Sequence, residues 1–550
     1  MTTRQPGPFP WSRGRQDAGD VQTTERGAGH AAFRGKEAKE MQQLVACADA
    51  LCLRDILPHG RFIGASDIRV RSCSSDPRKC RPGDVYVAIV DADGDGHDEA
   101  DEAVAGGAIA VVSERLLPVR VPCCVVADTR EAYGQICQRL AGQPDRALRL
   151  VGVTGTHGKT TTALLITAIL RAAQQNVGVT CSLGYSDGAT TAAAQTATPP
   201  SHDLARWLAQ MVTNGCSHGV VEVSSDALAT RRLSGVSLDA AVLTNMRREH
   251  LDLHGNLDNY RRAKRRLFDH LKPGGFAVIN ADDVASHTLL ESLHVPLITV
   301  GMRSFAQVQA TVLERCVSEQ TFLLTAGQEC VPVRTRTIGD QFVYCCLSAA
   351  AVGLVMGLDL TTIVRGIETL EYVPGRLERL ECGQDFSVFV DHAQTPSALA
   401  LSLHAIRQVT TKRVICVYGA AHWQDMEQRA AIGRVAERGA DIGIITSNNP
   451  GHEPPLQIAH DILDGFRNPA KAHIIPDRQK AIHWALSEAQ PGDTVIITGK
   501  GDELFQTLGS REVHFDDREV ACRWLYGTQP KLVDRESTVT LPFRLGPEWN

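Results

Sequence analysis

The stretch VGVTGTHGKTTT, residues 151–162, decides how the whole chain is interpreted. Its first residues form an apolar run typical of a buried β-strand, and the residues after Lys159 begin a helical pattern. Between strand and helix, Gly155 and Gly158 permit a tight turn whose backbone N–H groups converge on phosphate oxygens. The stretch therefore predicts a nucleotide phosphate loop.

The side chains of this loop support the same interpretation. Lys159 would add a cation, Thr160 would offer its hydroxyl to Mg²⁺, and Thr156 and Thr161 complete the loop. A strict P-loop would have glycine where this chain has Val153, so the loop is a variant. The strand-turn-helix context favours phosphate binding over an ordinary strand-to-helix turn.

Composition limits the class of protein. The chain has 550 residues, 43% hydrophobic and 22% charged, which is typical of a soluble protein with several domains. A net charge of −6 argues against nucleic acid as a partner. We expect no membrane span, because no run of about 18 apolar residues occurs. The 16 cysteines are scattered without a signal peptide, so we expect free thiols and a cytoplasmic location.

The chain divides into segments of different character. Strands and helices alternate through the segments 41–148, 149–372 and 373–528, between polar tails at 1–40 and 529–550. The continuously apolar strands predict an α/β fold of parallel sheets covered on both faces. Ligands of such sheets collect at the carboxyl ends of the strands.

Acidic and basic residues follow several of these strands. Glu222 ends the strand GVVEV and is either a second Mg²⁺ ligand or a helix-capping or surface carboxylate. His250 and Asp252 follow the next strand and could reach the same metal, although a lone histidine there is more often structural. A basic helix over 260–268 is either a solvated face or, against the acidic balance of the chain, a nucleic-acid contact.

Short motifs along the chain occur in an order that resembles the Mur ligase family: GTHGKTT, EVSS, TNMRREHLDLHG, YRRAK, VINADD, PGRLERL, VDHAQTP, SNNP and GKGDE. Within that family the chain is most similar to the MurE type, the UDP-N-acetylmuramoyl-tripeptide synthetases, over about residues 60–526. The resemblance implies a three-domain architecture with a central P-loop parallel sheet and a Rossmann-like C-terminal domain. The first domain would bind the UDP-linked substrate, the second ATP, and the third would complete the ligase site.

The resemblance also implies a reaction of peptidoglycan biosynthesis. With ATP and Mg²⁺, the carboxylate of a UDP-N-acetylmuramoyl-peptide becomes an acyl phosphate, which the amino group of an incoming amino acid attacks. A cation-rich site is needed because the triphosphate and the carboxylate are both anions. The protein must therefore supply positive charge that screens the triphosphate from the carboxylate.

Residue roles follow from the same resemblance. It implies catalytic roles for Lys159, Lys264, His250 and Arg376, and a metal shell of Thr160, Glu222, His250 and a carbamylated Lys264. The nucleotide would contact Gly155, Thr156, Gly158, Lys159, Thr160, Thr161, Asn280, Arg376 and Asp391. The substrates would contact Thr196, Thr198, Ser224, Arg232, Asn449, Gly499 and Glu503.

The chain departs from the family pattern mainly in its last third. Phe342 and Cys345 replace asparagines of the adenine pocket, Asp226 replaces a histidine, and Asp502 replaces a histidine of the GKGDE motif. Enzymes that add diaminopimelate carry D-N-P-R, in which the arginine grips the distal carboxylate. The corresponding residues here are Asn448, Asn449, Pro450 and Gly451, and the preceding glycine-rich turn reads GAAHWQD.

Three functions are compatible with these departures. The chain is an active MurE-type ligase with an altered choice of amino acid, a related ligase for another carboxylate or amine, or a non-catalytic relative that binds nucleotide or cell-wall precursor. In an active enzyme, closure about residues 370–376 would bring Arg376 and Asp391 onto ATP and exclude water from the acyl phosphate.

Overall fold

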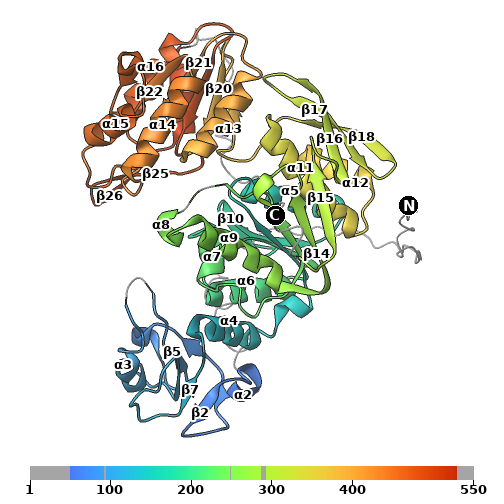
Figure 1. Ribbon diagram of the computed structural model, residues 1–550, viewed down its shortest axis with the longest axis vertical. Helices are drawn as coiled ribbons and strands as arrows, with labels where there is room; N and C mark the ends of the chain where they lie inside the picture. Colours follow the sequence, from blue (N-terminus) through green and yellow to red (C-terminus); the bar gives the residue numbers. More distant parts are fainter. Residues whose placement is uncertain (1–49, 92–93, 248, 250, 287–292, 529–550) are drawn as a thin grey trace, which may run out of the picture. The chain divides into compact units, whose positions relative to one another are not determined.

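A computed structural model describes residues 50–91, 94–247, 249, 251–286 and 293–528 (Figure 1). The described residues form two compact units, which lie within Met1–Leu140 and Ala141–Asn550. Within the described ranges, every helix is too short or too polar to cross a membrane.

The first unit contains a five-stranded sheet in the order β2-β7-β6-β5-β4 and a separate pair, β1 with β3. Its strands are β1 Leu51–Cys52, β2 Arg61–Ile63, β3 Arg69–Val70, β4 Cys73–Ser74, β5 Val85–Val87, β6 Ala110–Ser113 and β7 Cys123–Val125. Its helices are α2 Leu53–Ile56, η1 Pro77–Lys79, α3 Ala100–Ala105 and α4 Thr129–Leu140. Strands β4 to β7 pair in parallel, whereas β2 pairs antiparallel with β7.

The second unit begins with an eleven-stranded sheet in the order β11-β10-β9-β12-β8-β13-β14-β15-β16-β17-β18. Its strands are β8 Arg149–Thr154, β9 Val177–Cys181, β10 Gly184–Ser186, β11 Thr191–Ala192, β12 His218–Glu222, β13 Leu238–Leu243, β14 Leu271–Asn280, β15 Leu297–Gly301, β16 Val308–Arg315, β17 Gln320–Ala326 and β18 Glu329–Thr335. The accompanying helices are η2 Pro144–Arg146, α5 Lys159–Ala172, α6 Ser201–Thr213, α7 Ser225–Ala229, α8 Leu251–His254, α9 Leu257–Arg265, η3 Arg266–His270, α11 Asp340–Val355 and α12 Leu360–Thr369.

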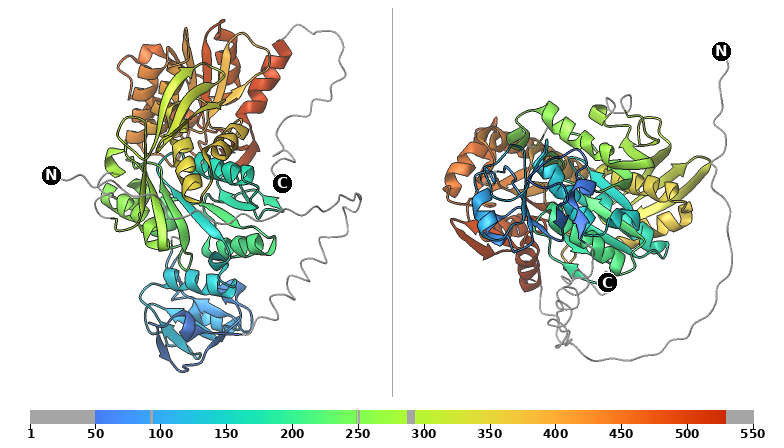
Figure 2. Two further views of the ribbon diagram at one scale, coloured as in Figure 1. Left: turned by 90° about the vertical axis from the view of Figure 1, so that its right-hand side faces the viewer. Right: turned by 90° about the horizontal axis from the view of Figure 1, so that it is seen from below.

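Alternating residues of the central strands enter two different cores, because successive side chains of a strand point to opposite faces. Val151 and Val153 of β8 pack with α5, α11 and α12, whereas Leu150 packs with α6, α7 and η3. Helices thus cover both faces of the sheet (Figure 2). The expected parallel α/β sheet is confirmed for β9, β12, β8, β13, β14 and β15.

The far end of this sheet was not expected from the sequence. Strands β16, β17 and β18 form an antiparallel meander, and only alternate residues of β16 are buried. Such alternation is typical of a strand with one solvated face, and it is weaker than the continuous apolar runs of the parallel strands.

A second sheet follows in the order β19-β20-β24-β21-β22-β23. Its elements are β19 Glu378–Leu380, β20 Ser387–Asp391, α13 Pro396–Arg407, β21 Val414–Tyr418, α14 Met426–Gly439, β22 Ile442–Ile445, α15 Pro455–Leu463, η4 Pro469–Lys471, β23 Ala472–Ile474, α16 Arg478–Glu488, β24 Thr494–Thr498 and α17 Asp517–Thr528. A hairpin of β25 Phe505–Leu508 and β26 Arg511–His514 follows β24. Helices α13, α14 and α15 cover one face, and α16 and α17 cover the other.

The position of β24 determines where the loops of this sheet meet. β24 comes last in the chain among the parallel strands, but it lies between β20 and β21 and pairs in parallel with both. The loops after these strands therefore leave the same edge of the sheet beside one another, which is where ligands bind in doubly wound folds.

Candidate active site at the phosphate loop

The phosphate loop connects β8 to α5, as the sequence predicted. Gly155 has a φ of +154°, and a Cβ there would lie 1.8 Å from Thr244 Oγ1. Gly158 has a φ of +82°, and a Cβ there would lie 2.7 Å from Cys345 Sγ. Both positions require glycine, since any side chain would collide and Gly158 also has a left-handed backbone.

Buried hydroxyl groups hold the loop from below. The Thr156 and Tyr260 hydroxyls are 2.7 Å apart, and the Arg247 N–H donates to Thr156 Oγ1 over 2.8 Å. The Lys159 ammonium donates to the Thr156 carbonyl over 3.0 Å. Among the described residues Lys159 contacts only this carbonyl oxygen, so its charge remains available to an anion in the adjoining cavity, which Thr161 also lines.

A buried carboxylate lies beside the first turn of α5. Thr160 Oγ1 and the Ser182 N–H each donate to Glu222 Oε2 over 2.9 Å. Glu222 is 2% exposed, and no lysine or arginine among the described residues has a nitrogen within 4.0 Å of its oxygens. A carboxyl oxygen beside a hydroxyl and a backbone N–H, buried without a basic partner among the described residues, fits a divalent cation of the hard, oxygen-binding kind.

The protein alone does not complete a metal shell within the described ranges, which hold no cluster of three or more His, Cys, Asp or Glu side chains. His250 lies outside the described residues, and the Asp252 side chain is likewise not described. Additional ligands would have to come from phosphate oxygens, water or a modified side chain.

Lys264 lies buried beside the phosphate loop. It lies on α9, where the sequence indicated a solvated basic face, yet it is 1% exposed. Its ammonium donates to the Gly155 carbonyl over 2.7 Å and lies 4.7 Å from the centroid of the Tyr260 ring. Burial, and secondly the charge of Lys159, lower the pKa of Lys264 well below its usual value.

A cavity of about 450 Å³ opens above the phosphate loop. Its wall includes the loop, Glu222 and Ser224, together with residues of the second sheet's segment: Arg376, Asp391, His392, Gln394, Thr395 and Ser402. Phe342 and Cys345 also line it. The structure therefore places Arg376 and Asp391 in the wall of the cavity above the phosphate loop, and their contact with ATP on closure stays a prediction.

Glu249 contacts residues of both large sheets' domains at this cavity. The sequence gave no reason to single it out, apart from its place in the REHLD motif. It accepts hydrogen bonds from the Thr395 and Ser397 hydroxyls and lies 3.3 Å from His157 Nε2. Burial alone would raise the pKa of Glu249, but the contacts with His157, Ser397 and Thr395 lower it to about 2. Glu249 is therefore an anion that ties the phosphate loop to the start of α13.

Three predicted nucleotide contacts already have protein partners. Arg376 donates to Asp502 over 2.6 Å, and Asp391 accepts from the Leu377 N–H over 2.8 Å. Asn280 accepts from the Asp282 N–H over 2.9 Å and does not line the cavity. Contact between Asn280 and the adenine stays a prediction.

The residues predicted to bind the UDP-linked substrate form a chain of hydrogen bonds. Thr196 donates to the Thr198 carbonyl over 2.8 Å, and Thr198 donates to the Glu222 carbonyl over 2.8 Å. Arg232 donates to the same Thr198 carbonyl over 3.1 Å. Ser224 caps α7 and reaches the cavity wall. This group thus adjoins the carboxylate proposed to hold the metal.

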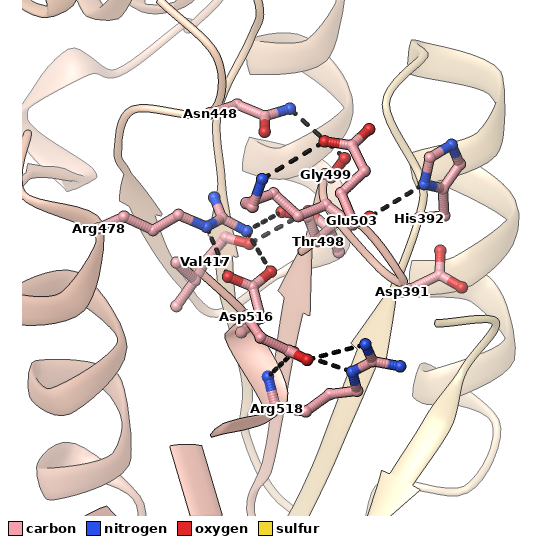
Figure 3. A network of polar contacts seen from close by, with 12 residues as sticks. Asp391, His392, Val417, Asn448, Arg478, Thr498, Gly499, Glu503, Asp516 and Arg518 are labelled. Carbon is pink, nitrogen blue, oxygen red and sulfur yellow. Dashed lines mark hydrogen bonds and ion pairs between the residues drawn. The ribbon is translucent and has the colours of Figure 1, made fainter. Parts of the chain in front are cut away.

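A polar group lies at the carboxyl edge of the second sheet (Figure 3) and adjoins the cavity, whose wall Gln394 also lines. Gln394 donates to the Gly499 carbonyl over 2.8 Å and to Glu503 over 2.7 Å. Asn449 donates to Glu503 over 3.0 Å. The structure thereby brings together Asn449, Gly499 and Glu503, the residues predicted to contact the incoming amino acid.

Comparison with known families places two matches on the second unit. Residues 153–353 match the Mur ligase middle domain, and residues 375–501 match the Mur ligase, glutamate ligase domain. The first match contains the phosphate loop, Glu222 and Lys264. The second contains Asp391 and the loops of the second sheet.

Similar proteins cover most of the chain. It is 39% identical over 454 residues to a protein of Geobacillus kaustophilus named UDP-N-acetylmuramoyl-L-alanyl-D-glutamate--2,6-diaminopimelate ligase, covering 81% of this chain and 93% of that protein. A protein of Syntrophomonas wolfei with the same name is 35% identical over 470 residues, covering 84% and 96%. A solved structure of a ligase of that name matches with a TM-score of 0.64 at 30% identity, covering 87% of this chain and 99% of the other.

Proposed function

Because the chain belongs to the Mur ligase family, we propose that it is an ATP-dependent, ADP-forming ligase that joins an amino acid to the carboxylate of a UDP-N-acetylmuramoyl-peptide in peptidoglycan synthesis. Family membership confirms the resemblance drawn from the ordered motifs, and with it the expected α/β Mur ligase architecture. The observation that carries the proposal is the buried Thr160–Glu222 pair beside a glycine-dependent phosphate loop.

Each residue has a distinct task in this proposal. The loop N–H groups and Lys159 would hold the β- and γ-phosphates, while Thr160 and Glu222 would hold Mg²⁺. Held there, the ion would supply screening of the negative charge of the phosphates. Arg376 would exchange Asp502 for a phosphate oxygen when the segments close, and Glu249 keeps the loop in register with α13. Exclusion of water then protects the acyl phosphate until the amine attacks.

We further propose that Lys264 is carbamylated. Its lowered pKa leaves more of the neutral amine, which can attack CO₂, lose a proton and become an anionic carbamate. Such an anion beside Gly155 would replace a cation with a metal ligand. Lys264→Ala is expected to be inactive and to regain part of its activity with added short-chain carboxylic acids. Full activity without them would remove Lys264 from the site.

The remaining sequence predictions complete this proposal. Thr198, Ser224 and Arg232 would hold the UDP-linked substrate beside the metal. We propose domain boundaries at 148/149 and 372/373 and a cytoplasmic location, consistent with the cytoplasmic supply of ATP that the reaction needs. The two compact units of the structure meet at 140/141 instead, and both larger segments belong to the second unit.

Release of ADP from the purified protein tests the function directly. We expect release only when UDP-N-acetylmuramoyl-dipeptide, an amino acid and Mg-ATP are all present. Omitting either the dipeptide or the amino acid is the control. A folded protein that shows no affinity for Mg-ATP in calorimetry would contradict the proposal.

A non-catalytic relative is the second candidate, and one observation favours it. Phe342 and Cys345 line the nucleotide cavity at positions where the family pattern has asparagines, so the wall offers fewer hydrogen bonds to a base. This candidate predicts that Mg-ATP binds while no combination of dipeptide and amino acid releases ADP. The same assay therefore separates the two candidates.

A further inference from the structure

Four loops meet at the carboxyl edge of the second sheet, one after each of β20, β21, β22 and β24. The Asn448 amide donates to the Gly499 carbonyl over 3.4 Å, and the His422 N–H donates to the Asn449 carbonyl over 3.0 Å. Together with the contacts of Gln394, these bonds link all four loops directly. We call this group of loops, residues 392–395, 419–425, 446–454 and 499–504, the acceptor edge.

The acceptor edge is poor in positive charge. Its four loops, all described, contain one lysine and no arginine. That lysine, Lys500, is fully buried; its ammonium donates to the Phe505 carbonyl and lies 3.4 Å from Glu503. Lys500 therefore stabilises its own turn through these contacts and is not available to bind a ligand.

Among the described residues, three arginines from outside these loops contact the acceptor edge, and each is already paired. Arg376 donates to Asp502 over 2.6 Å, and the buried Arg478 donates to Asp517 over 2.6 Å and to the Ser447 carbonyl over 3.4 Å.

The third arginine, Arg429 on α14, donates to both oxygens of Glu453 over 2.6 and 2.7 Å and to Asp461 over 2.7 Å. Its remaining contacts are to the Ala421 and His422 carbonyls. A guanidinium enclosed by two carboxylates and two carbonyls is not available to a carboxylate of a substrate.

The turn after β22 has no space for a long cationic side chain. Gly451 has a φ of +56°, and a Cβ there would lie 2.8 Å from Nδ1 of His422, whose ring covers this position. His422 Nδ1 in turn contacts the Asn449 carbonyl over 3.1 Å. The imidazole thus fills the direction in which a side chain of residue 451 would extend.

Exposed apolar side chains flank the same turn. Trp423 is 54% exposed and lies edge-on to His422, with 4.9 Å between ring centroids. On the other side, Gly451 pairs with Leu508, so the exposed apolar residues of β25, including Phe505 at 51% exposure, continue from it. The acceptor edge therefore offers apolar surface where positive charge is lacking.

We propose that the acceptor edge selects an amino acid with an uncharged, apolar side chain, in contrast to the diaminopimelate named for the relatives. The inference rests on the proposed ligase function and specifies its acceptor. A distal carboxylate would lose hydration here without gaining a cation, whereas an aliphatic side chain would bury apolar area against Trp423 and Phe505.

Acceptors that differ by single groups test this selectivity. In the ADP-release assay with UDP-N-acetylmuramoyl-dipeptide, we would compare norleucine, lysine, 2-aminopimelate and 2,6-diaminopimelate, which add an ammonium, a carboxylate or both to one aliphatic chain. We expect kcat/KM for norleucine to exceed that for lysine and that for either dicarboxylate at least tenfold. A smaller ratio or the reverse order overturns the inference and leaves the ligase function intact. Absence of release with every acceptor overturns the ligase function and the inference with it.

Variants test whether the apolar surface is the cause. Trp423→Ala and Phe505→Ala are each expected to raise KM for norleucine at least fivefold, with KM for ATP unchanged. Tyr526→Ala, at a 57% exposed aromatic on α17, is the matched control and should leave both constants unchanged. If Trp423→Ala and Phe505→Ala behave like this control, the proposed apolar contact is wrong.

Discussion

The carboxyl edges of the two large sheets differ in whether their charged side chains already have protein partners. At the central edge, considering the described residues, the Lys159 ammonium contacts only a carbonyl oxygen, and the buried Glu222 has no lysine or arginine within salt-bridge distance. At the acceptor edge, Glu503 accepts from Gln394 and Asn449 and lies beside Lys500. The same topological rule brings loops together at both edges. The partners of the charged side chains decide whether an edge attracts ions or excludes them.

The largest effect is expected when the positive charge of the phosphate loop is removed, which tests whether the central edge binds the nucleotide. Lys159→Ala should lower kcat for ADP release by about 10³, the upper end of what loss of one charge-stabilising group costs. Lys480→Ala, at a solvent-exposed lysine on α16, should leave kcat unchanged. Wild-type turnover in Lys159→Ala, measured on protein with an unchanged circular dichroism spectrum, would show that the central edge is not the nucleotide site.

The cation beneath the acceptor edge should matter for stability and not for catalysis. Arg429→Met leaves the buried Asp461 without its partner, so we expect the free energy of unfolding to fall by about 3–5 kcal/mol. Thermal denaturation measures the loss. Arg407→Met removes an exposed pair with Asp441 and should cost about 0–1 kcal/mol.

Equal losses of stability in these two arginine variants would contradict the structural role of Arg429. At a temperature where Arg429→Met is folded, KM for the amino acid should stay within about twofold of the wild-type value, because the guanidinium does not face a ligand. A selective rise of that KM would show that Arg429 does contact the amino acid, and it would overturn the contrast between the two edges.

Neutralising Glu503 tests whether the acceptor edge affects the amino acid separately from ATP. Glu503→Gln weakens the hydrogen bonds from Gln394 and Asn449 that hold the loops of the acceptor edge together. It should raise KM for the amino acid about tenfold, since a tenfold change corresponds to about 1.4 kcal/mol, within the range for a hydrogen bond to a charged group. KM for ATP should not change. Glu512→Gln, at an exposed glutamate of β26, is the control. Equal changes in both KM values for Glu503→Gln would mean that the two edges are not functionally separate.

The smallest expected effect concerns pH and the central sheet. Burial alone would raise the pKa of Asp282, but hydrogen bonds from the Met302 and Ser304 N–H groups and the Tyr344 hydroxyl lower it to about 2. The carboxylate therefore stabilises the fold fully above about pH 4, and this contribution is lost as the pH falls toward about 2.

Asp282→Asn tests that contribution. It should reduce the free energy of unfolding by about 1 kcal/mol at pH 7, a value that allows for solvent screening, and the difference from wild type should vanish near pH 2. Urea unfolding at a series of pH values measures it. Glu329→Gln, at an exposed residue of β18, should show no pH-dependent difference. A constant difference for Asp282→Asn would contradict the role of its charge.

Much of the central site could be predicted from sequence because it depends on residues close together in the chain. The run from Gly155 to Thr160 specifies a strand, a turn and a helix through local backbone geometry. The position of Glu222 followed from the rule that parallel strands end at one edge. Lys264 was harder, since a basic helix pattern indicates solvent, and only the packing of α9 against the loop buries this one lysine.

At the acceptor edge the sequence showed only which side chains of the family pattern are replaced in this chain. That Gly451 lies under the His422 ring, and that Arg429 is enclosed by carboxylates, depends on residues tens of positions apart. Glu249 likewise gained significance only through its contacts with α13's first residues. Contacts of this kind depend on how helices pack, which local patterns do not encode.

The sequence by itself determined the family, the alternation of strands and helices and the phosphate loop, because each is written in short-range order and in motifs that occur in a fixed succession. Only the tertiary structure decided which charges remain available to a ligand. The physical reason is that the reactivity of a charged group depends on its burial and its partners, and these are supplied by segments that the fold, and not the chain order, brings together.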